Sequence, residues 1–164
     1  MNATGFETTG AGKFEVIGND KTIDFNGKDG FKTNSTNKTE LVLNNLVFTN
    51  SNSAIITTTD NRDTTVTVND SLFKDNKVAV TNGGTLSFNN VTVNKGDSTN
   101  ENVIKNDGSL YLNGENTISS NITGNGNVYM NSGMTDLSNS FVENNTFTIN
   151  SGSLKFSADT FSNA

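Results

Sequence analysis

Residues 80–90 read VTNGGTLSFNN, and Leu86-Ser87-Phe88-Asn89 within this stretch decides the fold. Side chains alternate between the two faces of a β-strand, so the two apolar side chains share one face and the serine points to the other. The Asn-Gly-Gly group before the strand consists of residues that tolerate a positive φ, as a tight corner requires. The stretch therefore predicts a corner, a short half-buried strand and an Asn that ends it.

The same order of apolar, any residue, apolar and Asn recurs along the whole chain. Six copies end in Asn, a seventh ends in Ser, and their first residues lie 18 to 26 residues apart, with a mean near 22. The copies are Ile23-Asp24-Phe25-Asn26, Leu41-Val42-Leu43-Asn44, Val66-Thr67-Val68-Asn69, Leu86-Ser87-Phe88-Asn89, Leu110-Tyr111-Leu112-Asn113, Val128-Tyr129-Met130-Asn131 and Leu154-Lys155-Phe156-Ser157. Helical repeats of about 34 residues or more do not fit this spacing, whereas a β-solenoid does.

Two further short strands are expected in each repeat. Those upstream of the copies are Phe14-Glu15-Val16, Val78-Ala79-Val80, Val103-Ile104 and Phe147-Thr148-Ile149. Those downstream are Leu46-Val47-Phe48, Leu72-Phe73, Val91-Thr92-Val93 and, more weakly, Ile118 and Leu137. We therefore predict one all-β domain over 1–164, a right-handed, single-stranded parallel β-helix. It would contain about seven coils of about 22 residues with three short strands each, after an irregular lead-in over 1–13.

Antiparallel hairpins packed as a sandwich also give strands at short, regular spacing. A sandwich has no reason to repeat the same order of strand, corner and strand, whereas a solenoid must place like residues above like. Disorder is the other alternative, because hydrophobic residues make up only 31 % of the chain. In a solenoid, stacked Asn side chains can bond along the axis in ladders, which explains how so polar a chain folds.

Composition excludes several function classes. The net charge of −6 and the single, scattered Lys and Arg residues argue against binding to nucleic acid or to an anionic membrane. Absence of Cys excludes disulfides and thiolate metal sites. The chain contains no run of 18 apolar residues, so we expect no membrane span. The residues after Met1 lack the basic and then apolar order of a signal peptide, so none is expected. Because the chain stops partway round a coil after Phe161, we expect a fragment of a longer array.

Catalytic chemistry has few candidate residues. The chain lacks His, which excludes Ser-His-Asp systems and histidine-bound zinc. The densest acidic stretch, Asp60-Asn61-Arg62-Asp63, is interpreted as a solvated loop, with a Ca²⁺ site at Asp60 and Asp63 as the alternative. We predict no catalytic, metal-binding or cofactor-binding residues and expect a protein that is not an enzyme.

Four residues are candidates for ligand contact. Tyr111 and Tyr129 occupy the outward position of successive copies, so stacking would place one above the other as a platform for a sugar. The alternative is two ordinary surface aromatics. Lys95 and Asp97 belong to a Lys-Gly-Asp tripeptide, similar to an integrin-recognition motif, in the longest predicted loop, although Gly-Asp is also common turn chemistry.

Copies such as residues 80–90 and 106–114 resemble the passenger domains of bacterial autotransporter adhesins, and adhesin-like β-helices of the broad pectate-lyase-like superfamily. The resemblance covers residues 14–161 and lies in the style of the repeat. It implies a secreted or surface-anchored protein that binds host surfaces, glycans or copies of itself. Enzymes of that superfamily use Asn-Thr-Asp, Asp-Asp and Gly-His-Gly segments, or Ca²⁺-binding aspartates with an Arg. The chain has none of these segments, and Arg62 is its only Arg.

The leading hypothesis is a surface-exposed adhesin segment on the bacterial outer surface. It would bind a host glycan or protein, or self-associate, through Asn- and Thr-rich outer faces, and many weak contacts would add up to avidity. A structural stalk without a ligand is the second hypothesis. A carbohydrate-active β-helix, such as a lyase, hydrolase or tailspike-like enzyme, is the third.

Overall fold

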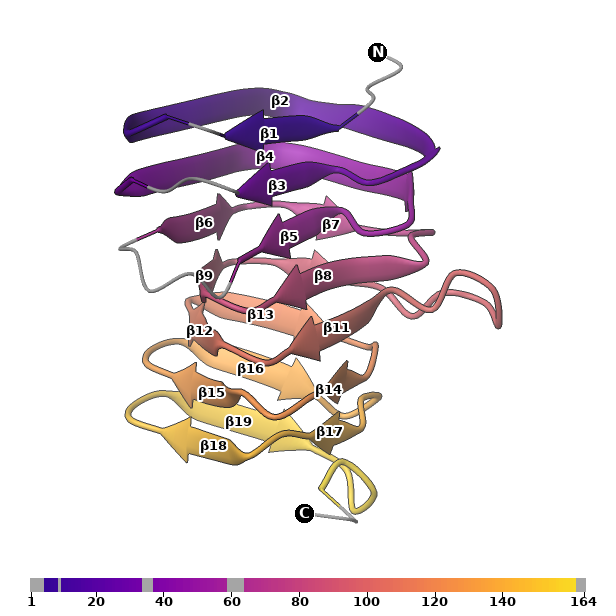
Figure 1. Ribbon diagram of the computed structural model, residues 1–164. Helices are drawn as coiled ribbons and strands as arrows, with labels where there is room; N and C mark the ends of the chain where they lie inside the picture. The colour runs from indigo at the N-terminus through magenta and orange to yellow at the C-terminus, as the bar shows by residue number, and fades with distance from the viewer. Residues whose placement is uncertain (1–4, 9, 34–36, 59–63, 162–164) are drawn as a thin grey trace.

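The chain folds as an all-β solenoid. The computed structural model describes residues 5–8, 10–33, 37–58 and 64–161, and every regular element within these ranges is a β-strand. Successive coils stack from the N-terminal end at the top of Figure 1 to the C-terminal end at the bottom. As the chain descends, the strands in front run to the left and those behind run to the right, so the coil is right-handed (Figure 1).

Three faces enclose the interior. The first face is a seven-stranded sheet of β1 (Phe6–Thr8), β3 (Phe31–Thr33), β5 (Ile55–Thr57), β8 (Val78–Asn82), β11 (Val103–Asn106), β14 (Ile122–Thr123) and β17 (Val142–Glu143). The second face contains β6 (Thr65–Asn69), β9 (Thr85–Asn89), β12 (Ser109–Asn113), β15 (Asn127–Met130) and β18 (Thr146–Ile149). The third face contains β7 (Leu72–Phe73), β10 (Thr92–Val93), β13 (Glu115–Ile118), β16 (Met134–Leu137) and β19 (Ser153–Phe156).

The first two coils differ from the others in strand length. Strands β2 (Gly12–Lys28) and β4 (Thr39–Ser51) each continue through a corner and serve both the second and the third face. From β5 onward, coils contribute three separate strands each, as predicted, but there are five such coils rather than the predicted seven or so. The predicted irregular lead-in over 1–13 contains β1, which pairs with β3 and whose Phe6 ring stacks on Phe31, and the start of β2.

Every strand pair among the described residues is parallel. This excludes the sandwich of antiparallel hairpins. The five central copies of the sequence pattern also lie in one column on the second face: Leu41 pairs with Val66, and the column continues through Leu86, Leu110 and Val128. These five copies of the sequence pattern therefore occupy equivalent positions in successive coils.

The first and last copies of the pattern lie elsewhere. Ile23 pairs with Phe48, and Leu154 pairs with Thr135, which places both copies on the third face. Phe14 and Phe147, assigned to upstream strands in the sequence, take their places on the second face. The pattern misassigned them because strands on both faces alternate inward and outward residues in the same way, and only pairing between coils fixes the face.

The interior is a set of stacked apolar columns. Aromatic rings of Phe25, Phe48, Phe73 and Phe88 follow one another along the axis, with successive ring centroids 6.5, 4.6 and 5.6 Å apart. All four are fully buried. One coil could not exclude water from such side chains, so each coil depends on its neighbours for its core.

The corners between the second and third faces share one backbone conformation. Asn45, Asp70 and Asn90 have φ between 48° and 56°, and the equivalent positions in later coils are occupied by Gly. Asn, Asp and Gly are the residues that adopt this left-handed conformation most readily. The sequence predicted positive φ at the corner before the strand, Asn82-Gly83-Gly84. That corner is present between β8 and β9, but none of its three residues has a positive φ, which occurs instead at the corner after the strand.

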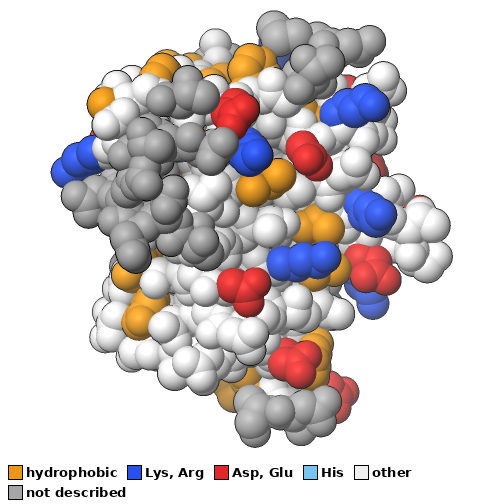
Figure 2. Space-filling view, viewed as in Figure 1, with side chains coloured by type: hydrophobic (Ala, Val, Ile, Leu, Met, Phe, Trp, Pro, Cys, Tyr) orange, Lys and Arg blue, Asp and Glu red, His pale blue; other side chains and the backbone are white. Residues whose placement is uncertain are grey.

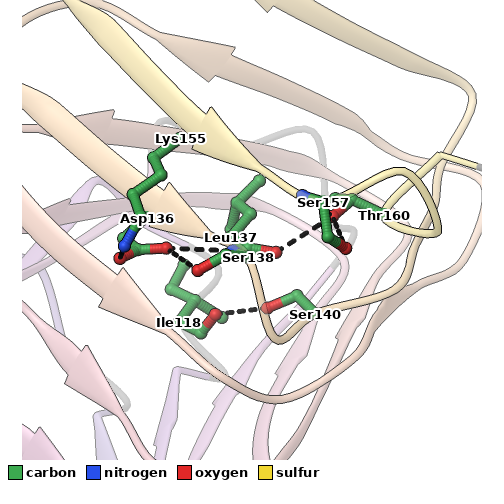
Figure 3. A network of polar contacts seen from close by, with 8 residues as sticks. All are labelled: Ile118, Asp136, Leu137, Ser138, Ser140, Lys155, Ser157 and Thr160. Atoms are coloured by element: carbon green, nitrogen blue, oxygen red, sulfur yellow. Dashed lines mark hydrogen bonds and ion pairs between the residues drawn. The ribbon is translucent and has the colours of Figure 1, made fainter.

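Charged groups lie on the outside of the coil. Figure 2 shows Lys, Asp and Glu side chains of both signs interspersed over the visible face. Near the C-terminal end, Asp136 accepts hydrogen bonds from Lys155 at 2.8 Å and from the Ser138 backbone at 2.9 Å (Figure 3). These bonds lower the pKa of Asp136 to about 2, with the Lys155 bond as the largest cause. Side chains thus tie the last coils together on the outer surface as well as in the core.

Candidate binding surface

Two tyrosines stack on the outer side of the second face. Tyr111 of β12 pairs directly with Tyr129 of β15, and their ring centroids are 5.0 Å apart with 17° between the ring planes. Both side chains are partly exposed. The predicted stacking of these two candidate residues is therefore confirmed.

The stacking leaves each ring with one covered and one open side. Tyr111 pairs with Ser87 in the preceding coil, and Tyr129 pairs with Thr148 in the following coil. Both neighbours are much smaller than a phenol ring. We call the ring sides next to Ser87 and Thr148, at the two ends of the stack, the open faces. These two sides, rather than a single flat platform, are the candidate contact surfaces.

Polar side chains flank the tyrosines on both sides. Ser109 and Asn127 pair with each other two residues before the tyrosines, and Asn113 and Asn131 follow two residues after them. Two residues along a strand span about 7 Å, so these groups point outward beside the rings. All four are partly exposed. An apolar patch bordered by hydroxyl and amide groups results.

Asn113 belongs to a ladder of side-chain amides. The Nδ2 atoms of Asn69, Asn89 and Asn113 each donate to the Oδ1 atom of the preceding ladder member, at 2.6, 2.6 and 2.8 Å. The first member, Asn44, donates to the Glu15 carboxylate at 2.6 Å. The Asn ladder expected from the sequence is therefore present, and its hydrogen bonds join positions 20 to 25 residues apart.

The ladder stops between Asn113 and Asn131. It resumes one coil later, where Asn150 donates to Asn131 at 2.8 Å, but no side-chain hydrogen bond among the described residues joins Asn113 to Asn131. The corner length changes at this point. Asn113 and Gly114 join the paired positions Leu112 and Glu115, whereas three residues, 131–133, separate their partners in the next coil. The additional residue ends the strand pairing before Asn131, and the two amides lose their alignment.

The Lys-Gly-Asp tripeptide lies in the loop between β10 and β11, at the corner of the third and first faces. The Asp97 Oδ1 atom accepts three hydrogen bonds, from the Thr99 hydroxyl at 2.7 Å and from the backbone of Thr99 and Asn100 at 2.9 and 2.8 Å. These bonds hold the pKa of Asp97 below its ordinary value, with the Thr99 side chain as the largest cause. Asp97 thus organises its own loop.

A pocket of about 300 Å³ lies beside this loop. Its lining includes Lys95, Asp97 and Glu101 from the loop, together with Val103 and Asn121. The loop and the tyrosine pair are on different faces, so the structure does not bring the four predicted contact residues together. Glu101 and Asn121 were not singled out in the sequence, because no motif marks residues that only a corner brings together.

Three other expectations concern metal and membrane. Asp60 and Asp63, the alternative Ca²⁺ ligands, lie outside the described residues, as does Arg62. No group of three or more Asp, Glu, His or Cys side chains in the described part of the chain is placed to hold a metal ion. The described residues also contain no helix with the length and hydrophobicity needed to cross a membrane.

The sequence analysis did not predict that the ladder breaks between Asn113 and Asn131. A signal for it is present, since Asn113-Gly114 becomes Asn131-Ser132-Gly133 in the next copy. The change in corner length could have predicted a break in the ladder.

No protein-family model, curated protein or solved structure matches the chain. The parallel β-solenoid is therefore established from the strand pairing itself.

Proposed function

We propose that this chain is a non-enzymatic binding segment displayed at a bacterial cell surface, and that its second face binds a neutral glycan. The observation that carries the proposal is the partly exposed stack of Tyr111 on Tyr129. Tyrosine combines an apolar ring with a polar hydroxyl. The C–H groups of a sugar can pack on the ring, and its hydroxyls can form hydrogen bonds with the tyrosine hydroxyl. The style of the repeat, which resembles autotransporter passengers, supports the surface location.

The two open ring faces are the contact points for sugar rings. One sugar would lie over Ser87 and pack against the Tyr111 ring, and another would lie over Thr148 and pack against the Tyr129 ring. Each sugar would stack on its tyrosine as a further aromatic ring would. The hydroxyls and amides of Ser109, Asn127 and their neighbours would satisfy the hydroxyls at the edges of the sugars.

A glycan array probed with the whole chain tests the proposal. The decisive variant is the double substitution Tyr111→Ser and Tyr129→Thr, because Ser and Thr already occupy this column at positions 87 and 148. We expect binding by the wild-type chain and at least a tenfold loss in the double variant, about 1.4 kcal/mol. The matched control is Tyr111→Phe with Tyr129→Phe, which keeps the rings and should keep most of the affinity.

A structural stalk is the second candidate. The continuous amide ladder from Asn44 to Asn113 and the buried core of the central coils favour it, because both stiffen a rod without offering a site. Failure of the folded wild-type chain to bind any glycan on the array would support the stalk over the binding segment. Sedimentation of the same sample distinguishes a third outcome, self-association, by a concentration-dependent mass.

A further inference from the structure

The geometry points to Asn113 and Asn131 as the residues that recognise one hydroxyl group of the bound glycan. This inference rests on the proposed function and adds the residues that recognise the neutral glycan and its orientation, an oligosaccharide that lies along the rod axis. It starts from the break in the amide ladder, which lies beside the tyrosine pair.

All amides of the first ladder point the same way. Each Nδ2 donates toward the N-terminal end, and the last donor reaches the Glu15 carboxylate. Asn113 is therefore the acceptor end of the ladder, and its Oδ1 accepts no hydrogen bond from the described residues. Aligned hydrogen bonds polarise one another, so this oxygen is a stronger acceptor than that of an isolated amide.

Asn131 is the donor end of the second ladder. Its Oδ1 accepts from Asn150, while its Nδ2 donates to none of the described residues. The Oδ1 acceptor of Asn113 and the Nδ2 donor of Asn131 thus belong to the two sides of the same break. A hydroxyl group donates one hydrogen bond and accepts others, so it can complete both amides at once. Two hydrogen bonds of about 2.8 Å bridge up to about 5.6 Å, which covers the coil spacing of about 4.8 Å.

Charged ligands fit the break less well. A carboxylate accepts from Asn131 but cannot donate to Asn113, and an ammonium group has the opposite defect. Each would leave one amide without its partner and would place like partial charges in contact. The pair of unmatched groups therefore favours a neutral group with both functions, and the hydroxyl of a sugar has both.

The position of the break fits an oligosaccharide better than a single sugar. The open faces of Tyr111 and Tyr129 lie at the levels of Ser87 and Thr148, three coil steps apart, or about 14 Å. The break lies between these levels, about 7 Å to one side of the tyrosine column. The middle residues of a glycan that contacts both open faces can therefore reach the break.

The test measures affinity by calorimetry for the neutral oligosaccharide that the wild-type chain binds best on the array. Asn113→Leu and Asn131→Leu remove the two recognising amides at nearly constant volume. Asn69→Leu is the matched control, because it breaks two bonds of the same ladder two coils away from the break. We expect a five- to tenfold loss for each of the first two variants and less than a twofold change for Asn69→Leu.

Two additional measurements make the result specific to one hydroxyl. The fold-loss of affinity in the double variant Asn113→Leu/Asn131→Leu should be no more than about twice the fold-loss of either single variant. Independent contacts would instead multiply the two fold-losses, whereas here both amides contact the same group. Removal of the correct hydroxyl in a deoxy-oligosaccharide should weaken wild-type binding five- to tenfold and leave binding to the double variant, which lacks both amides, unchanged. Circular dichroism and thermal melting establish that each variant is folded.

The outcomes separate the two proposals. Loss of affinity on removal of the tyrosine rings, with unchanged affinity in Asn113→Leu and Asn131→Leu, overturns the inference and leaves the glycan-binding function intact. An equal loss in Asn69→Leu assigns the effect to ladder stability and also overturns the inference. Failure of the folded wild-type chain to bind any glycan overturns both.

Discussion

Gly133 lies directly against Gly114 of the preceding coil, so closely that a Cβ atom on Gly133 would be 2.2 Å from the Gly114 carbonyl oxygen. The φ of Gly133 is also positive, at 74°. We predict that Gly133→Ala lowers the free energy of unfolding by more than about 2 kcal/mol, since it adds a backbone clash to left-handed strain. Denaturant titration measures the effect.

Gly27 provides the control for this prediction. It has the same φ of 74°, but a Cβ atom there would meet nothing within 4 Å. Gly27→Ala should therefore show only the strain, about 1 kcal/mol. Equal losses in the two variants would mean that contact between coils at Gly133 contributes nothing.

Asn82 is a buried amide at the corner between the first and second faces. Its Nδ2 donates to Asn106 at 2.7 Å and to the Ser109 carbonyl at 3.1 Å, and its Oδ1 accepts from Thr57 and from Gly84. Asn82→Ala would leave several buried groups without partners, so we expect a loss of about 2–4 kcal/mol in the free energy of unfolding.

The matched variant is Asn139→Ala, at an exposed position. It should change stability by less than about 0.5 kcal/mol. If both variants unfold at the same denaturant concentration, the buried hydrogen bonds of Asn82 do not stabilise the corner.

The pH dependence of stability should report on Asp136, whose pKa falls to about 2 through its bonds with Lys155 and Ser138. A carboxyl group with a lowered pKa in the folded state stabilises the fold at a pH above its unfolded value of about 3.9. That contribution is lost as the pH falls through about 2. We therefore predict that the wild-type chain loses this increment between pH 4 and pH 2.

Asp136→Asn removes the titrating group and isolates its effect from that of Asp97, which also has a lowered pKa. Thermal unfolding of both chains at several pH values between 5 and 2 should show two curves that converge as the pH falls. Curves that stay parallel would contradict the assignment.

Asp97 is predicted to order its loop without supporting the rod. Asp97→Ala removes the three hydrogen bonds to Thr99 and Asn100 and should speed amide hydrogen exchange in the loop between β10 and β11. The global free energy of unfolding should change by less than about 0.5 kcal/mol, because the side chain is exposed. A large global loss, or unchanged exchange at Asn100, would show that the loop is organised differently.

Much of the fold could be read from particular residues. Alternation in Leu86-Ser87-Phe88 predicted the strands, Asn82 with its two glycines predicted a corner, and the recurrence of Asn predicted the ladder. The outward, stacked placement of Tyr111 and Tyr129 followed from the same repeat. These predictions succeeded because they depend on residues in one strand and on their equivalents in the next coil.

Other features depended on longer-range geometry. The first and last copies of the pattern were assigned to the wrong face, because Ile23 and Leu154 alternate just as residues of the second face do. The face that these two copies join is not visible until the strand pairing is known. Lys95 and Asp97 stay predicted ligand contacts, and the structure adds that the Asp97 carboxylate accepts hydrogen bonds from Thr99 and Asn100 in its own loop.

The sequence by itself determined that this is a stack of short strands joined by Asn- and Gly-rich corners, because side-chain alternation and tolerance of positive φ are local properties. Only the tertiary structure decided which face each strand joins, which side of each tyrosine ring is open and where the ladder breaks at Asn113. These features depend on register between coils some 20 residues apart. Backbone hydrogen bonds and corner lengths set that register jointly, and no single strand carries it.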